Sequence, residues 1–234
     1  MALPSFSTPN NATYLRVGVG EDDKGRKRAV LARRVKEGTP GAVQVFKGSG
    51  DPALDKDGNT VWRTEHPFIE GRIIKIERRQ PEYNGKPVDE LNISLVDADG
   101  ELVILQLTKG DEYWGDFAQR VPGVDFAKSV KLTPYMIPRQ DKEGNTIEGK
   151  YNRMLVLRQD GAKIERQFKR DDPDGPPPVT YDEDEKKYLW GKRNNWLDKG
   201  PIEEAIKLAA FHNSSEPTQE EVIGGEGMDI DEIL

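Results

Sequence analysis

The sequence predicts a mostly β protein, a small antiparallel barrel or sandwich, and two observations lead to this class. Turn signals recur at short intervals, and between them lie short runs that are rich in β-branched and aromatic residues. The turn residues accept a positive φ at low cost, which suits tight hairpins. These turns are Asp57-Gly58-Asn59, Asn84-Gly85, Asp99-Gly100, Gly144-Asn145 and Asp160-Gly161.

The central region predicts five strands. Gly71 lies inside the first of them, where a glycine suits a bulge or a barrel corner. In the second, Leu91, Ile93 and Leu95 fall on one face of the strand. The expected strands are 68–79, 91–97, 101–108, 129–137 and 151–158, with a polar loop at 138–150.

One helix is expected between the third and fourth strands. Asp111 can cap its N-terminus, and Glu112 favours its first turn. Pro122-Gly123 ends it. Its apolar residues Trp114, Phe117, Ala118 and Val121 have helical spacing, so we expect Trp114 in the core.

This β-β-β-α-β-β order resembles the OB-fold, a five-stranded antiparallel barrel, over about 68–160. Residues 13–65 predict N-terminal β extensions of this barrel, and Pro201 begins a C-terminal helix that we expect to dock on it. We therefore divide the chain into an OB-fold domain with the β extension (1–170), a Pro-rich linker with the docking helix (171–213) and an acidic tail expected to be disordered (214–234).

The charge is distributed unevenly. The net charge is −7, but residues 1–170 hold 29 Lys and Arg against 25 Asp and Glu, a net of +4. Seven acids and no bases lie in 171–185, and the same holds for 215–234. This pattern indicates a mildly basic body with an acidic regulatory tail.

Several chemistries find no support in the sequence. There is no cysteine and there are only two histidines, so no His- or Cys-based zinc site or cysteine nucleophile is expected. No phosphate-binding loop motif and no transmembrane run are present. We expect a protein that is not an enzyme, has no cofactor, metal site or membrane contact, and resides in the cytoplasm.

The barrel region interleaves cations with aromatic residues, as single-stranded DNA binding requires. Lys and Arg can contact the phosphates, and flat rings can stack on unpaired bases. The predicted DNA-binding residues are Trp62, Arg72, Lys75, Arg78, Arg79, Tyr83, Lys86, Lys128, Lys131, Tyr135, Arg139, Lys150, Tyr151, Arg153 and Arg158.

The C-terminus alternates acidic and apolar residues and ends on two apolar ones, which suits capture by a basic, apolar pocket on a partner. These residues are Met228, Asp229, Ile230, Asp231, Glu232, Ile233 and Leu234. The tip resembles that of bacterial and phage single-stranded DNA-binding proteins, although it ends in Ile-Leu and not in Pro followed by an aromatic residue. With the OB-like order, the chain resembles the phage members of this group.

The resemblance implies sequence-independent binding of single-stranded DNA in phage replication, recombination or repair. The tail would recruit replication and recombination proteins within the infected host cell. Alternatives are a virion or assembly protein built on a β-barrel, an OB-fold module that binds protein or RNA, and a metal-dependent nuclease. Both a monomer and a homodimer are compatible with the sequence.

Overall fold

The fold is mostly β, as predicted: strands account for 47% and helical segments for 19%. The computed structural model describes residues 12–47, 50–83, 85–168, 172, 175–183 and 186–214. The strands of the main sheet are β1 (Thr13–Glu21), β2 (Lys27–Val35), β3 (Val43–Gln44), β4 (Trp62–His66), β5 (Ile69–Arg79), β8 (Glu90–Val96), β9 (Leu102–Thr108), β10 (Ser129–Gln140), β11 (Thr146–Gln159) and β12 (Ala162–Lys163).

Two short hairpins and a helical layer accompany the sheet. The hairpins are β6 (Glu82–Tyr83) with β7 (Lys86–Pro87), and β13 (Thr180–Asp182) with β14 (Lys187–Leu189). The helices are α1 (Glu112–Arg120) with the 3₁₀ turn η1 (Val121–Gly123), then α2 (Gly191–Leu197), the π-helical turn η2 (Asp198–Ile202) and α3 (Glu203–Ser214). Helix α1 lies between the third and fourth central strands, and Asp111 accepts hydrogen bonds from the N–H groups of Tyr113 and Trp114, as its capping role predicts.

The main sheet has the order β12-β11-β10-β5-β8-β9-β1-β2-β4-β3. All pairs are antiparallel except β1 with β9, which is parallel. The expected five-stranded antiparallel barrel differs from this arrangement, because the hydrogen-bonded order is open and mixed. The sheet nevertheless curls strongly, so that β10 and β2 approach each other although no ladder joins them among the described strands.

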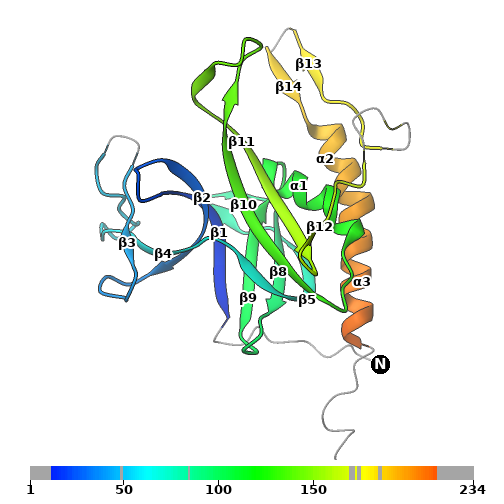
Figure 1. Ribbon diagram of the computed structural model, residues 1–234, viewed down its shortest axis with the longest axis horizontal. Helices are drawn as coiled ribbons and strands as arrows, with labels where there is room; N and C mark the ends of the chain where they lie inside the picture. Colours follow the sequence, from blue (N-terminus) through cyan, green and yellow to red (C-terminus); the bar gives the residue numbers. More distant parts are fainter. Residues whose placement is uncertain are drawn as a thin grey trace, which may run out of the picture.

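As expected for residues 13–65, the N-terminal strands extend the sheet at one end, beyond β9, in the order β1-β2-β4-β3. One local prediction needs correction. The polar loop expected at 138–150 is mostly strand, since β10 and β11 continue as a long hairpin that turns at residues 141–145 (Figure 1). Asp141 closes this turn by accepting N–H bonds from Glu143 and Asn145, a turn chemistry that also favours longer strands.

One hydrophobic core fills the space between the curled sheet and the helices. Trp114 and Phe117 of α1 are buried in it, with Leu15, Ile73 and Leu91 from three strands. Gly71 lies at a close approach between strands, because a Cβ at this position would stand 2.5 Å from the carbonyl oxygen of Val96. A side chain there would force β5 and β8 apart.

Helix α3 runs beside β5 at one side of the sheet (Figure 1). Ala205 and Ala209 are its buried residues, and their small size lets the helix approach closely. The Asn213 amide donates to the carbonyl oxygen of Ile74, so the helix satisfies a backbone group of β5 where the strand leaves β10.

A buried ion cluster fastens α1 to β11. Asp116 accepts the Leu155 N–H at 3.0 Å, and its carboxylate lies 2.5 Å from Arg166 Nε and 3.3 Å from Arg120 Nε. The side chains of Asp116 and Arg120 are only 1% and 4% exposed. Each therefore depends on the other for charge compensation.

Substituting Asp116→Ala is expected to lower the free energy of unfolding by about 3–5 kcal/mol, because it removes the buried carboxylate and leaves the buried Arg120 guanidinium with only a 4.0 Å contact to the exposed Glu165 as charge partner. Urea unfolding followed by circular dichroism measures this change. Asp160→Asn is the control, since it breaks an exposed ion pair with Lys128, keeps a residue that accepts the positive φ at this turn, and should cost less than about 1 kcal/mol. Equal losses in the two variants would contradict a structural role for the buried cluster.

Candidate nucleic-acid interface

One face of the main sheet collects cations from several strands. Because side chains alternate along a strand, the ladder register assigns each residue to a face. Opposite partners on this face include Arg72 with Ser129, Lys75 with Ser94, and Arg79 with Glu90. We call this side the cationic face and define it by Arg16, Arg72, Lys75, Arg79, Lys131 and Arg158.

An irregularity in β5 makes this grouping possible. The register with β8 shifts between Ile73 and Lys75, so one extra residue is accommodated there. The shift keeps Ile73 and Ile76 in the core while Arg72 and Lys75 both lie on the cationic face. Without it, strict alternation would turn Lys75 toward the core.

Positive charge dominates this face. Three acids, Glu70, Glu77 and Glu90, lie on the same face as its six cations. This count covers the described residues of β1, β5, β8 and β9 and the paired parts of β10 and β11. Glu77 lies 2.8 Å from Lys75 and 4.0 Å from Arg79, and Glu70 lies 4.0 Å from Lys131. The remaining net charge of +3 opposes the negative charge of the whole chain and attracts polyanions.

Arg16, on the outermost strand of the face, is held by a buried acid. Its Nη2 atom lies 2.8 Å from Glu90, whose side chain is 2% exposed while that of Arg16 is 46% exposed. Arg16 also donates to the Tyr83 hydroxyl and lies 5.0 Å from the centre of the Tyr83 ring, and that hydroxyl donates to Glu90 at 3.3 Å. Glu90 and Tyr83 thus fix the position of the Arg16 guanidinium, and the exposed part of the side chain can still contact a ligand.

Two amide side chains extend this network across the strands. Arg16 Nε donates to Gln106 at 3.1 Å, and Gln106 Nε2 donates to Asn92 Oδ1 at 3.3 Å. Asn92 is fully buried, and its Nδ2 atom has no hydrogen-bond partner within the described part of the chain. A row of connected polar groups therefore crosses β1, β9 and β8.

Aromatic rings flank the cations. Tyr14, Tyr83 and Tyr135 are 38%, 40% and 37% exposed, so part of each ring faces solvent and can stack on a base. Phe68 carries the Lys131 ammonium 3.4 Å from its ring centre, a cation–π contact that holds this lysine in place.

The structure brings together part of the predicted DNA-binding set. Arg72, Lys75, Arg79, Lys131, Tyr135 and Arg158 lie on the cationic face, and Tyr83 joins it through Arg16. Arg78, Tyr151 and Arg153 occupy the opposite side by alternation. Burial raises the pKa of Tyr113 on α1 to about 12, and the positive charge of Arg153 partly opposes this shift.

The other predicted residues lie at turns or at the far end of the sheet. Lys86 is on the β6–β7 hairpin, Arg139 and Lys150 are on the β10–β11 hairpin, and Lys128 precedes β10. A hydrogen bond from Lys128 to Asp160 raises the pKa of this lysine. Trp62 is half-buried on β4, and its indole nitrogen is buried. A single channel through all fifteen residues is therefore not formed.

Sequence reasoning missed Arg16, Glu90, Asn92 and Gln106. Arg16 lies outside the region that resembles the OB-fold, and it joins the site only through the parallel pairing of β1 with β9. The signal for the other three was available: Glu90, Asn92 and Gln106 alternate with leucines and isoleucines in strands that are otherwise apolar.

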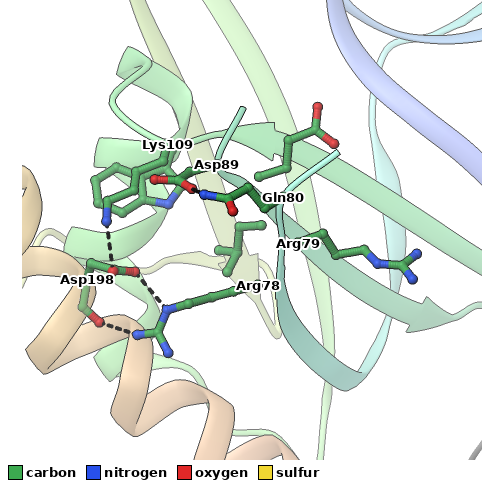
Figure 2. Close-up of a pocket in the computed structure, with 9 residues that line it drawn as sticks. Arg78, Arg79, Gln80, Asp89, Lys109 and Asp198 are labelled. Atoms are coloured by element: carbon green, nitrogen blue, oxygen red, sulfur yellow. Dashed lines mark hydrogen bonds and ion pairs between the residues drawn. The ribbon is translucent and has the colours of Figure 1, made fainter. Parts of the chain in front are cut away.

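An ion-paired clasp lies beside the face, where the helical layer meets the ends of β5 and β9. Asp198 of η2 lies 3.0 Å from Arg78 Nε and 2.9 Å from Lys109 Nζ, and Arg78 also donates to the Asp198 carbonyl oxygen at 2.7 Å (Figure 2). Burial raises the pKa of Asp198, but the bonds from Lys109 and Arg78 outweigh it and hold the pKa below its ordinary value of 3.8.

Within the described residues, no group of three or more His, Asp or Glu side chains is arranged to hold a metal ion. The described helices are all too short or too polar to cross a membrane. No family model, curated protein or solved structure matches this chain. The site therefore stands on its own geometry.

Substituting Asp198→Ala is expected to lower the free energy of unfolding at pH 7 by about 1.5–3 kcal/mol, the contribution of hydrogen bonds between charged groups. Because folding lowers the pKa of Asp198, its stabilisation is present above the ordinary pKa and disappears as the pH falls through the lowered one. Urea unfolding at several pH values should show the difference between wild type and variant shrinking below pH 3.8.

Glu203→Ala serves as the control for this comparison, because it removes an exposed acid that is paired with Lys207 within α3. Its effect should stay below about 1 kcal/mol. A difference between wild type and Asp198→Ala that stays constant at acid pH would contradict the clasp.

Proposed function

We propose that this chain binds single-stranded DNA along the cationic face, without sequence specificity and as a stoichiometric partner in phage DNA replication, recombination or repair. One observation carries the proposal: six cations and three half-exposed tyrosines lie together on one face of a protein whose net charge is −7. Phosphates require the cations, and unpaired bases require the rings.

The order of elements supports an OB-like reading of this face. Strands β5, β8, β9, β10 and β11, with α1 before β10, follow the OB-fold order. In that fold the ligand lies on strands two and three and on the loops that join strands one to two and four to five. The corresponding parts here are β8, β9, residues 80–89 and residues 141–145.

The pairing of strands is OB-like in part. β5 pairs with β8 and β10, β8 with β9, and β10 with β11, as strands one to five of an OB-fold do. The departure is at the closing pair, because β9 pairs in parallel with the N-terminal β1 and not with β11. The N-terminal strand β1 thereby contributes Arg16 and Tyr14 to the cationic face.

The proposed mechanism is shielding and straightening of the strand, with no chemical step. Cations replace the counterions of the phosphates, and bases that stack on tyrosines cannot pair with one another. The buried Glu90 fixes the Arg16 guanidinium before DNA arrives, so less side-chain entropy is lost on binding.

The double variant Lys75→Ala/Arg79→Ala should weaken binding to unlabelled dT oligomers and flatten its salt dependence. Each lost phosphate contact reduces the log–log salt slope by about 0.7. Competition against a labelled dT oligomer, followed by fluorescence anisotropy at several salt concentrations, measures both quantities. Arg26→Ala/Lys207→Ala removes the same charge from exposed positions that are paired within their own turn or helix, and should leave the slope unchanged.

The other function classes give different outcomes in the same assays. A virion or assembly protein would not retard dT oligomers in a gel. A nuclease would degrade them when magnesium is added. An RNA-binding module would prefer RNA in competition. Equal slopes for the two double variants would place the DNA elsewhere on the molecule.

We propose that the acidic tail competes with DNA for the cationic face and, once displaced, recruits replication proteins. The tail, residues 215–234 with its tip 228–234, lies outside the described residues, so the argument rests on charge alone: seven acids in the tail against a face of net +3. The last described residue is Ser214, and 20 extended residues reach roughly 65–70 Å, more than the width of a small domain.

Deleting residues 215–234 should raise the affinity for dT oligomers at low salt, and the gain should shrink as salt screens the tail. A full-length variant in which the seven tail acids become Asn or Gln is the matched control, since it removes the charge and keeps the length. Both should behave alike in anisotropy titrations. Unchanged affinity of both at every salt concentration would refute the competition.

A further inference from the structure

A hollow opens at the end of the sheet where β5 ends and β8 begins, and Arg78, Leu91 and Trp114 line it on the side of the helical layer. Its volume is about 310 Å³, and Arg79 and Glu90 belong to both the hollow and the face. Figure 2 shows Arg78 reaching from this end of the sheet toward Asp198, whereas Arg79 points the other way. A DNA strand that follows the cationic face to this end of the sheet reaches the hollow at Arg79 and Glu90, the two residues that belong to both.

The floor of the hollow is apolar and its mouth is polar. Leu91 and Trp114 line it and are both 1% exposed, so they form a rigid base. Gln80 and Asp89 line it and are exposed. The volume lies at the lower limit of small-ligand pockets, which suits a single flat ring better than a larger molecule.

The exposed pair Gln80 and Asp89 offers acceptors at the mouth. Gln80 Nε2 donates to Asp89 Oδ1 at 2.8 Å, which fixes both side chains. Asp89 Oδ2 and Gln80 Oε1 have no partner within the described part of the chain, and both can accept. The cations Arg78 and Lys109 also line the hollow, and each is ion-paired with Asp198.

We infer that the hollow receives one unpaired base of the bound strand and favours bases that carry an exocyclic amino group over thymine. This inference rests on the proposed function. Cytosine and adenine offer an N–H₂ donor to the Asp89 carboxylate, whereas thymine has a carbonyl oxygen at that position. The phosphate next to the inserted base lies within reach of Arg79, so binding stays general and acquires a modest base preference.

The test compares dC and dT oligomers of equal length, because both are pyrimidines of similar size. Anisotropy titration of wild type should give about 5- to 10-fold tighter binding of dC, the lower part of the range for one well-made base contact. Asp89→Ala should bring the dC affinity down to that for dT. Asp99→Ala, which removes an exposed acid from the β8–β9 turn, should keep the preference.

The outcomes separate the two proposals. If wild type binds dC and dT equally well, or if Asp89→Ala retains the preference, the base pocket is refuted while DNA binding stands. If neither oligomer binds, the proposed function fails and the pocket fails with it. A dT oligomer with one central cytosine adds a further check, since a single hollow predicts that one cytosine recovers most of the advantage of dC.

Discussion

The site depends on the parallel pairing of β1 with β9. This ladder joins residues 13–16 to residues 103–106, and it places Arg16 beside Gln106 and across from Glu90. Glu90 is buried, and an unpaired carboxylate at that depth would be strongly unfavourable. The Arg16–Glu90 ion pair therefore couples the position of β1 to the charge balance of the cationic face. Without β1 in this place, Glu90 would be a buried carboxylate without this cation, and without Glu90 the Arg16 guanidinium would lose its fixed position.

A second constraint is the register shift in β5. The segment from Ile69 to Arg79 places apolar side chains in the core on one side and cations on the cationic face on the other. Its sequence does not alternate strictly, because Ile73 and Ile74 are adjacent, and the shift between Ile73 and Lys75 absorbs the extra residue. Helix α3 then satisfies the Ile74 carbonyl oxygen through Asn213, at the place where β5 no longer has β10 as a neighbour.

Local signals predicted the elements well and their assembly only in part. The strands around 68–79, 91–97 and 101–108 and the helix capped by Asp111 follow from alternation, turn residues and helical spacing, which are local properties. The pairing of β1 with β9 links residues about 90 positions apart, and nothing in either strand specifies the partner. Face assignment failed for the same reason: Tyr151 and Arg153 lie opposite Pro138 and Met136, on the side away from Lys131, and only the register reveals this.

The clasp at Asp198 explains how a hollow beside a cationic face can accept a base and not a phosphate. Arg78 and Lys109 line the hollow and, if free, would attract the DNA backbone into it. Asp198 neutralises one of their two charges and holds both side chains in place, and the bonds from Lys109 and Arg78 hold its pKa below its ordinary value. Only Arg79 then remains at the rim to take a phosphate, so the backbone is held outside while the acceptors of Asp89 and Gln80 face the base. Loss of the Asp198 ion pairs should therefore reduce the preference for dC over dT more strongly than it reduces the overall affinity for DNA.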